Sequence, residues 1–174
     1  MSSAFQYDPL FAFLLARQFI ELSFENGFTS DVTIGFIGLS AFWSAADEDY
    51  DFSNQLAVIA LKICDRFQNY QNKSEICVAY AAHSNYKLAY EKLIAMLEAG
   101  IIIGIENGDN HYAAYNFVHS HLAMFVHGRN LQKIFNKKAH AVLKNIENIR
   151  NLKNTLAGVK MCIANLAGNT TDEM

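Results

Sequence analysis

The sequence is poor in the residues that form tight turns and in charge. It has one proline, Pro9, and nine glycines in 174 residues. An all-β sandwich needs many turn residues, so this shortage argues against one and favours long helices. Charged residues make up only 18% of the chain and hydrophobic residues 52%. That ratio excludes a disordered polar chain, because such chains cannot bury enough apolar surface to fold.

Cysteines are also few, and no segment has the character of a secretion signal. The three cysteines, Cys64, Cys77 and Cys162, fit no zinc or redox spacing, and we expect three buried thiols in a reducing compartment. The apolar run that begins at Leu10 has no basic residue before it, unlike a signal peptide. The uncharged stretch 32–46 is shorter than the about 20 residues of a membrane span. We therefore expect a cytoplasmic protein without membrane contact.

Helix-end signals divide the chain into about eight helices. Asp8 followed by Pro9 is typical of a helix start, and Gly27 of a helix end. Ser74 is expected to cap the fourth helix and Asp109 the sixth. The expected helices span residues 9–26, 32–46, 51–69, 74–84, 85–107 and 110–127, with a seventh from about 130 and an eighth ending at 167. We predict one domain, 8–168, followed by a disordered tail, 169–174.

A weak internal repeat predicts how these helices are arranged. At an offset of 81 residues, Glu25-Asn26-Gly27 matches Glu106-Asn107-Gly108, and Phe36 matches Phe117. Both matches fall at a helix–turn–helix corner. An offset of 81 is two units of about 40 residues, a period found in helical solenoids. The predicted fold is all-α, with four αα-hairpins in a right-handed array like that of tetratricopeptide (TPR) repeats.

The residue types that carry catalysis or metal binding are present without the required spacing. Neither Glu-x-x-His nor His-Glu-x-x-His occurs around any of the six histidines. Gly100, Gly104 and Gly108 recur every four residues, as in a helix that packs closely on a neighbour and unlike a phosphate-binding loop. We expect no cofactor, no metal and no enzymatic activity. The histidines are His83, His111, His119, His121, His127 and His140.

Charge is unevenly distributed, with a net −8 over residues 1–110 and +5 over 111–174. Arg129, Lys133 and Lys137 are four residues apart and are expected to line one side of the seventh helix. Leu131, Ile134, Phe135, Val142 and Ile146 should form its core side. Aromatic residues are scarce in this basic stretch, so nucleic acid is not the expected partner. We predict that the three basic residues contact an acidic protein surface.

The same stretch has a heptad pattern. Val142, Ile149, Leu156 and Ile163 are seven residues apart, with Leu152, Val159 and Leu166 between them. This pattern is typical of a coiled-coil seam, which would allow two chains to form a dimer. It is equally typical of the inner faces of two helices packed within one chain.

Three corners resemble a known family. They are residues 108–115 (GDNHYAAY), 128–131 (GRNL) and 165–168 (NLAG). They are similar to corners in the long TPR-like helical region of bacterial multi-sensor signalling kinases, which lies among kinase, ATPase and sensor domains. The resemblance implies a non-enzymatic interaction or regulatory module that binds a protein partner or neighbouring signalling domains. The alternative is a helical bundle that binds an apolar small ligand or acts on it, with His119 or His121 in the site.

Overall fold

The computed structural model describes residues 7–46, 48–68, 70, 72–136 and 149–168. Within these ranges 82% of the residues are helical and there is no strand, which confirms the all-α prediction. The helices are α2 (Pro9–Asn26), α3 (Val32–Ala46), α4 (Tyr50–Phe67), α5 (Lys73–Ser84), α6 (Tyr90–Glu106), α7 (Asn110–Val126), α8 (Leu131–Asn136) and α10 (Arg150–Leu166). The predicted tail, 169–174, lies outside the described residues.

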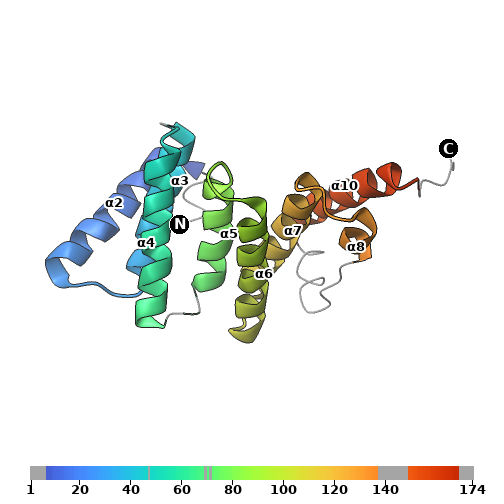
Figure 1. Ribbon diagram of the computed structural model, residues 1–174. Helices are drawn as coiled ribbons and strands as arrows, with labels where there is room; N and C mark the ends of the chain where they lie inside the picture. Colours follow the sequence, from blue (N-terminus) through green and yellow to red (C-terminus); the bar gives the residue numbers. More distant parts are fainter. Residues whose placement is uncertain (1–6, 47, 69, 71, 137–148, 169–174) are drawn as a thin grey trace.

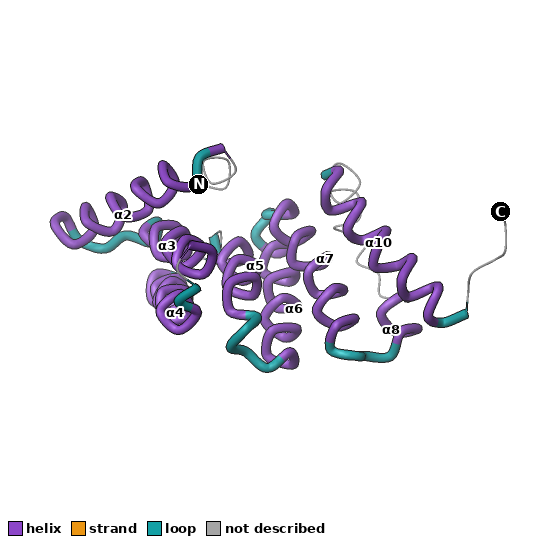
Figure 2. The backbone as a smooth tube through the Cα atoms, turned by 90° about the horizontal axis from the view of Figure 1, so that it is seen from above, coloured by secondary structure: helices purple, strands orange, loops and turns teal. Residues whose placement is uncertain are grey.

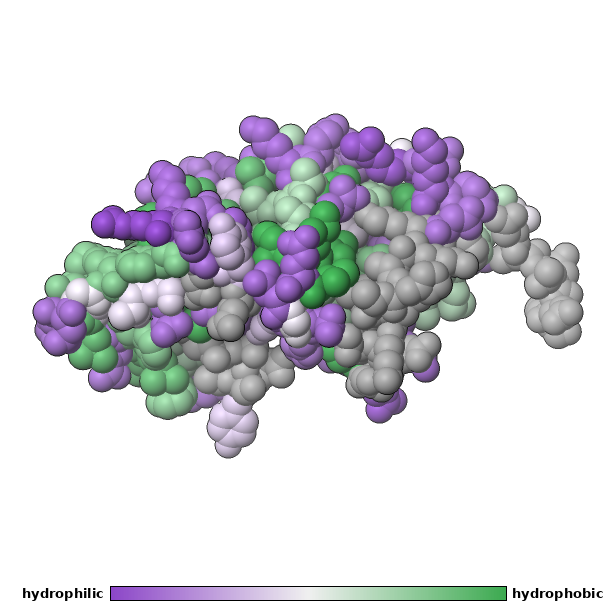
Figure 3. Space-filling model, turned by 90° about the horizontal axis from the view of Figure 1, so that it is seen from below, coloured by the Kyte–Doolittle hydropathy of each residue, from purple (hydrophilic) through white to green (hydrophobic). Residues whose placement is uncertain are grey.

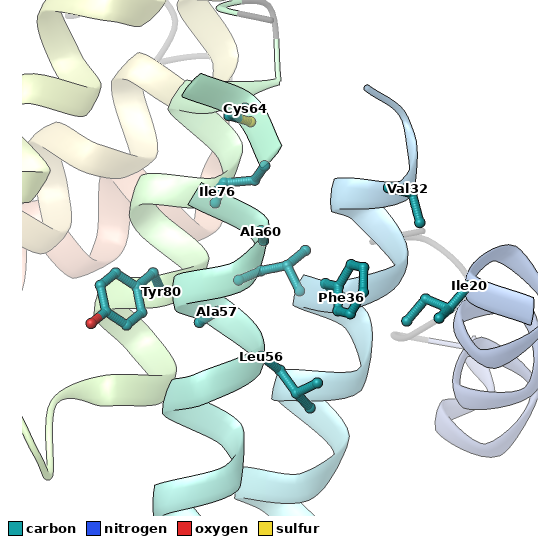
Figure 4. Close-up of a cluster of buried hydrophobic side chains, with 10 residues drawn as sticks. Ile20, Val32, Phe36, Leu56, Ala57, Ala60, Cys64, Ile76 and Tyr80 are labelled. Carbon is teal, nitrogen blue, oxygen red and sulfur yellow. The ribbon is translucent and has the colours of Figure 1, made fainter. Parts of the chain in front are cut away.

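The helices are stacked in the order of the chain, from α2 at one end to α10 at the other (Figures 1 and 2). Each helix packs against the next one described, and α3, α5, α7 and α10 also pack successively against each other. The buried side chains accordingly form three clusters along the array. The first, shown in Figure 4, joins α2 to α5 through residues such as Ile20, Phe36 and Ile76. The described part of the chain is therefore built from successive neighbour contacts, and no central core is shared by all of the helices described.

The helix ends follow the predicted chemistry at most corners. Asp8 accepts hydrogen bonds from the backbone N–H groups of Leu10 and Phe11, and Asp109 accepts one from Tyr112. Gly27 and Gly108 have positive φ angles of 97° and 76°, a backbone region that glycine enters without a Cβ clash. Residues 85–89 form a turn before α6, where the sequence predicted that the helix had already begun.

The two corners related by the 81-residue offset share further detail. The Asn26 side-chain amide donates to the Leu22 carbonyl at 3.0 Å, and that of Asn107 donates to the Ile103 carbonyl at 2.8 Å. The matched aromatic residues, Phe36 and Phe117, are both buried. The residues that repeat in the sequence thus make the same local interactions at both corners.

The prediction for Ser74 was wrong. Ser74 lies inside the first turn of α5 and is buried, and Asn72 precedes the helix without a side-chain cap bond. The Ser74 hydroxyl donates to the Gly100 carbonyl of α6 at 2.9 Å. Asn116 of α7 donates to the Ser74 carbonyl at 2.8 Å. A buried polar network therefore ties α5, α6 and α7 together.

Gly100 and Gly104 have the close-packing role that their spacing predicted. A Cβ atom at Gly100 would lie 2.4 Å from Asn116 Oδ1. One at Gly104 would lie 2.7 Å from Ser74 Oγ and 2.8 Å from the Asp109 carbonyl. Gly108 differs, because a Cβ there would meet nothing within 4 Å and its positive φ is what requires glycine.

Candidate functional site

Two of the three predicted basic site residues lie beside α8, but they do not share one helix. Gly128, at φ 75°, ends α7, and the Arg129 N–H donates to the Met124 carbonyl at 3.0 Å. Arg129 therefore belongs to the turn before α8, which corrects the expected single helical row. Lys133 lies within α8, and Lys137 is outside the described residues. Arg129 and Lys133 are both exposed.

Asn130 fixes the start of α8 between the two cations. Its side-chain oxygen accepts a hydrogen bond from the Lys133 N–H at 3.0 Å, the arrangement of a helix N-cap. Ile134 is buried as predicted, and Leu131 is half-buried. The side chain of Phe135, and Val142 and Ile146, lie outside the described residues.

The two cations lie at the edge of a hollow of about 980 Å³ between α6, the end of α7 and α8. Its apolar wall is formed by Ile94, Met124 and Ile134, all of which are buried. Glu98 of α6 also lines it. The hollow therefore offers apolar contact next to two positive charges and one carboxylate. We call it the basic hollow.

A side-chain contact between α6 and the residue that follows α7 lies next to the turn that carries Arg129. His127 Nε2 lies 2.9 Å from Glu91 Oε1, and the His127 ring stacks on Tyr90 with centroids 5.8 Å apart. A hydrogen bond from its own backbone N–H lowers the pKa of the Glu91 carboxyl, and His127 and Arg129 lower it further. No pattern in the sequence predicts this pair, because residues 36 positions apart carry no local signal of contact.

The histidines named for the alternative function do not come together. His121 is fully buried, with Nδ1 2.9 Å from the Phe117 carbonyl. His119 lines a separate groove between α5, α6 and α7, and burial lowers its pKa. This groove measures about 200 Å³, below the roughly 300–1,000 Å³ of typical small-molecule pockets. Burial also lowers the pKa of His83, to about 4. His140 lies outside the described residues.

The cysteines agree only in part with the prediction. Cys64 and Cys77 are buried, and burial raises the pKa of each thiol to about 11. Cys162 is exposed on α10, which contradicts the expectation of three buried thiols. α10 turns four apolar residues inward, and Cys162 lies off that face; the inward residues are Leu152, Leu156, Val159 and Ile163.

The inward face of α10 also accounts for the predicted heptad. Leu152 and Leu156 pack in the cluster with α7, and Val159 and Ile163 pack in the cluster that includes Ile134 of α8. Four of the five heptad residues on α10 are therefore buried within the molecule, as in the second of the two readings, whereas the fifth, Leu166, is exposed. Val142 lies outside the described residues.

Two kinds of feature are absent from the part of the chain that the structure describes. No group of three or more His, Cys, Asp or Glu side chains there is placed to hold a metal ion. None of the helices described has the length and apolar character needed to cross a bilayer.

Comparison with known proteins gives no relative. No family model matches the chain, and neither the curated proteins nor the solved structures include a significant match.

Proposed function

We propose that the chain is a non-enzymatic, TPR-like helical-repeat module that binds a protein partner in the bacterial cytoplasm. The observation that carries the proposal is the basic hollow on an array of stacked helices. Arrays of this kind bury one set of faces between neighbours and leave extended surfaces for partners. A regulatory role in signalling follows from the resemblance of its corners to the helical region of multi-sensor kinases.

The chemistry of the basic hollow favours one class of partner. Arg129 and Lys133 favour carboxylates, and arginine can bind a carboxylate through two parallel hydrogen bonds. The wall of Ile94, Met124 and Ile134 favours an apolar side chain next to them. The expected ligand is an acidic protein segment that also presents a large apolar residue.

A small-ligand bundle is the alternative function, and the groove at His119 is where it would act. We favour the protein-binding module because this groove is small and the second histidine, His121, is buried away from it. The net positive charge of residues 111–174 also favours a carboxylate-bearing partner at Arg129 and Lys133. A small-ligand function gives this charge no role.

The experiment compares capture of host proteins by the wild type and by the variant with Arg129→Glu, Lys133→Glu and Lys137→Glu. Lys62→Glu, an exposed charge reversal on α4, is the matched control. We expect a protein that is captured by the wild type and the control, is lost with the triple variant and is released as salt rises. The circular dichroism spectrum and melting temperature should stay nearly unchanged.

Two results would contradict the proposal. Unfolding of the triple variant would mean that these cations are internal structural charges. Capture that is equal for the wild type and the triple variant would place the binding surface elsewhere.

A further inference from the structure

Helix α2 packs on the rest of the molecule through a narrow face of mostly small side chains, with Phe13 half-buried against Phe42, and most of its other large side chains are exposed. Its buried residues are Ala12, Ala16, Ile20 and Ser23. A Cβ at Gly35 of α3 would lie 3.1 Å from the Ala16 carbonyl, so the two helices approach closely along this narrow face. Leucine and phenylalanine side chains cover the opposite side and are at least 41% exposed; they include Leu10, Phe11, Leu14, Leu22, Phe24 and Phe28.

α2 is the outer helix at its end of the array (Figures 1 and 2), and Figure 3 shows hydrophobic surface at that end. At the other end, the first half of α10 exposes polar residues such as Arg150, Lys153 and Asn154, and its second half also exposes Met161 and Leu166. End helices of repeat arrays require a polar outer face for solubility. The first half of α10 has such a polar surface, whereas the outer side of α2 exposes large apolar residues along its length.

Six exposed residues form a regular stripe along the outer side of α2. They are separated by four, three, four, three and four positions, which is the spacing of the apolar seam in a coiled coil. Phe28 follows the helix end, and its ring lies 5.2 Å from that of Phe24, which keeps it next to the stripe. We call these residues the α2 seam: Leu10, Leu14, Arg17, Glu21, Phe24 and Phe28.

The order of residues in the α2 seam is complementary to itself when two copies run antiparallel. Around a twofold axis at residue 19, Leu10 faces Phe28 of the second copy and Leu14 faces its Phe24. Arg17 then faces Glu21 of the second copy, and this charge pair occurs twice by symmetry. A parallel pair in register would place Arg17 against Arg17 and Glu21 against Glu21, so the charges select the antiparallel arrangement.

Within one chain Arg17 and Glu21 already form an exposed pair, with Arg17 Nε 2.7 Å from Glu21 Oε1 and side chains 63% and 56% exposed. Two antiparallel copies would bring these four charges together at the centre, between apolar layers on both sides. Half-exposed side chains of this size each offer roughly 100 Å², so the six give roughly 600 Å² per copy. A standard interface buries about 800 Å² per partner, which makes the α2 seam large enough for a reversible dimer.

We propose that the α2 seam binds a second copy of this chain as an antiparallel, twofold-symmetric helix pair. This interface is independent of the basic hollow, and its test does not depend on the proposed acidic partner. Dimerisation through α2 would place two partner-binding arrays in one assembly.

Sedimentation velocity of the full chain over a range of concentrations tests the proposal. A reductant is included because Cys162 is exposed. We expect the wild type to approach twice the 19.5 kDa of one chain. Arg17→Glu or Glu21→Arg alone puts like charges in both central layers and should weaken the dimer roughly 100-fold. Lys62→Glu on α4 is the control and should remain dimeric.

Two recombination experiments test the register. The double variant Arg17→Glu/Glu21→Arg restores both opposite-charge layers and should dimerise again. An equimolar mixture of the two single variants should form a heterodimer, because the two seam glutamates of the Arg17→Glu chain then face the two seam arginines of the Glu21→Arg chain. Circular dichroism confirms that each variant is folded. If a single charge variant is not, Leu14→Ser, which removes apolar contact from two symmetric layers at an exposed position, replaces it in the test for dissociation.

Each contrary result overturns the proposal. A wild type that stays monomeric means that the α2 seam serves a different partner. A dimer that survives both single charge reversals lies on another surface. Single variants that dissociate but do not recombine would show that the antiparallel register is wrong.

Discussion

Replacing Gly100 by alanine should destabilise the protein, although alanine is the better helix former. In an open helix position the change would gain about 1 kcal/mol. Here the new Cβ would lie 2.4 Å from Oδ1 and 2.6 Å from Cγ of Asn116, whose side chain is fully buried. Asn116 would have to move, and its amide donates to the Ser74 carbonyl at 2.8 Å and to the Tyr112 carbonyl at 2.9 Å.

The size of the effect follows from those contacts. Leaving a buried polar group without its partner costs about 1–3 kcal/mol, and overpacking costs a similar amount. After the gain in helix propensity, we expect a net loss of roughly 2 kcal/mol in the free energy of unfolding. For a chain of this length, that corresponds to a fall of roughly 4–8 °C in melting temperature.

Urea and thermal unfolding followed by circular dichroism measure this change. Gly158→Ala on α10 is the matched control, because a Cβ there meets nothing within 4 Å; it should stabilise by about 0.5–1 kcal/mol. In a double-mutant cycle, Asn116→Ala removes the obstacle, so the combined variant should lose less than the sum of the single changes. A Gly100→Ala variant as stable as the wild type, or additive effects in the cycle, would refute the packing argument.

Two further predictions use groups whose burial the structure defines. At pH 8 the exposed Cys162 should react rapidly with a thiol reagent. Cys64 and Cys77 should stay unreactive until the protein unfolds, because they are buried and burial raises the pKa of both thiols. Three thiols that react equally fast would contradict this burial. The His83 ring should titrate near pH 4 by NMR, whereas the unfolded chain binds its proton near pH 6.5. The free energy of unfolding should therefore fall as pH decreases from about 6.5 to 4, less steeply in His83→Gln; an NMR midpoint near 6.5 would show that the ring is solvated.

Local signals in the sequence predicted most of the helix boundaries. Asp8 and Asp109 cap helices as expected because capping depends on residues two or three positions away. Gly27 and Gly108 end helices because few other residues tolerate a positive φ. Such interactions are contained within one turn of chain, so the sequence alone is sufficient to identify them.

Contacts between distant segments were not predictable in the same way. Ser74 has the residue type of a cap, but its hydroxyl binds a carbonyl 26 positions away. The large residues of α2 have helical spacing, but spacing does not say which face packs inside one chain and which faces outward. Arg129 was assigned to a helix because it lies four residues before Lys133, whereas Gly128 and the capping Asn130 place it in a turn.

An extended array of helices with surfaces open to partners can be distinguished from a closed bundle by small-angle X-ray scattering. The measurement uses the Arg17→Glu variant, under conditions where sedimentation shows one species of 19.5 kDa. A compact globular chain of 174 residues would have a radius of gyration of about 16 Å. We predict a clearly larger value and a distance distribution with an extended tail, as expected for the stack from α2 to α10 in Figure 1. A radius of about 16 Å with a symmetric distribution would contradict the array and favour a closed helical bundle.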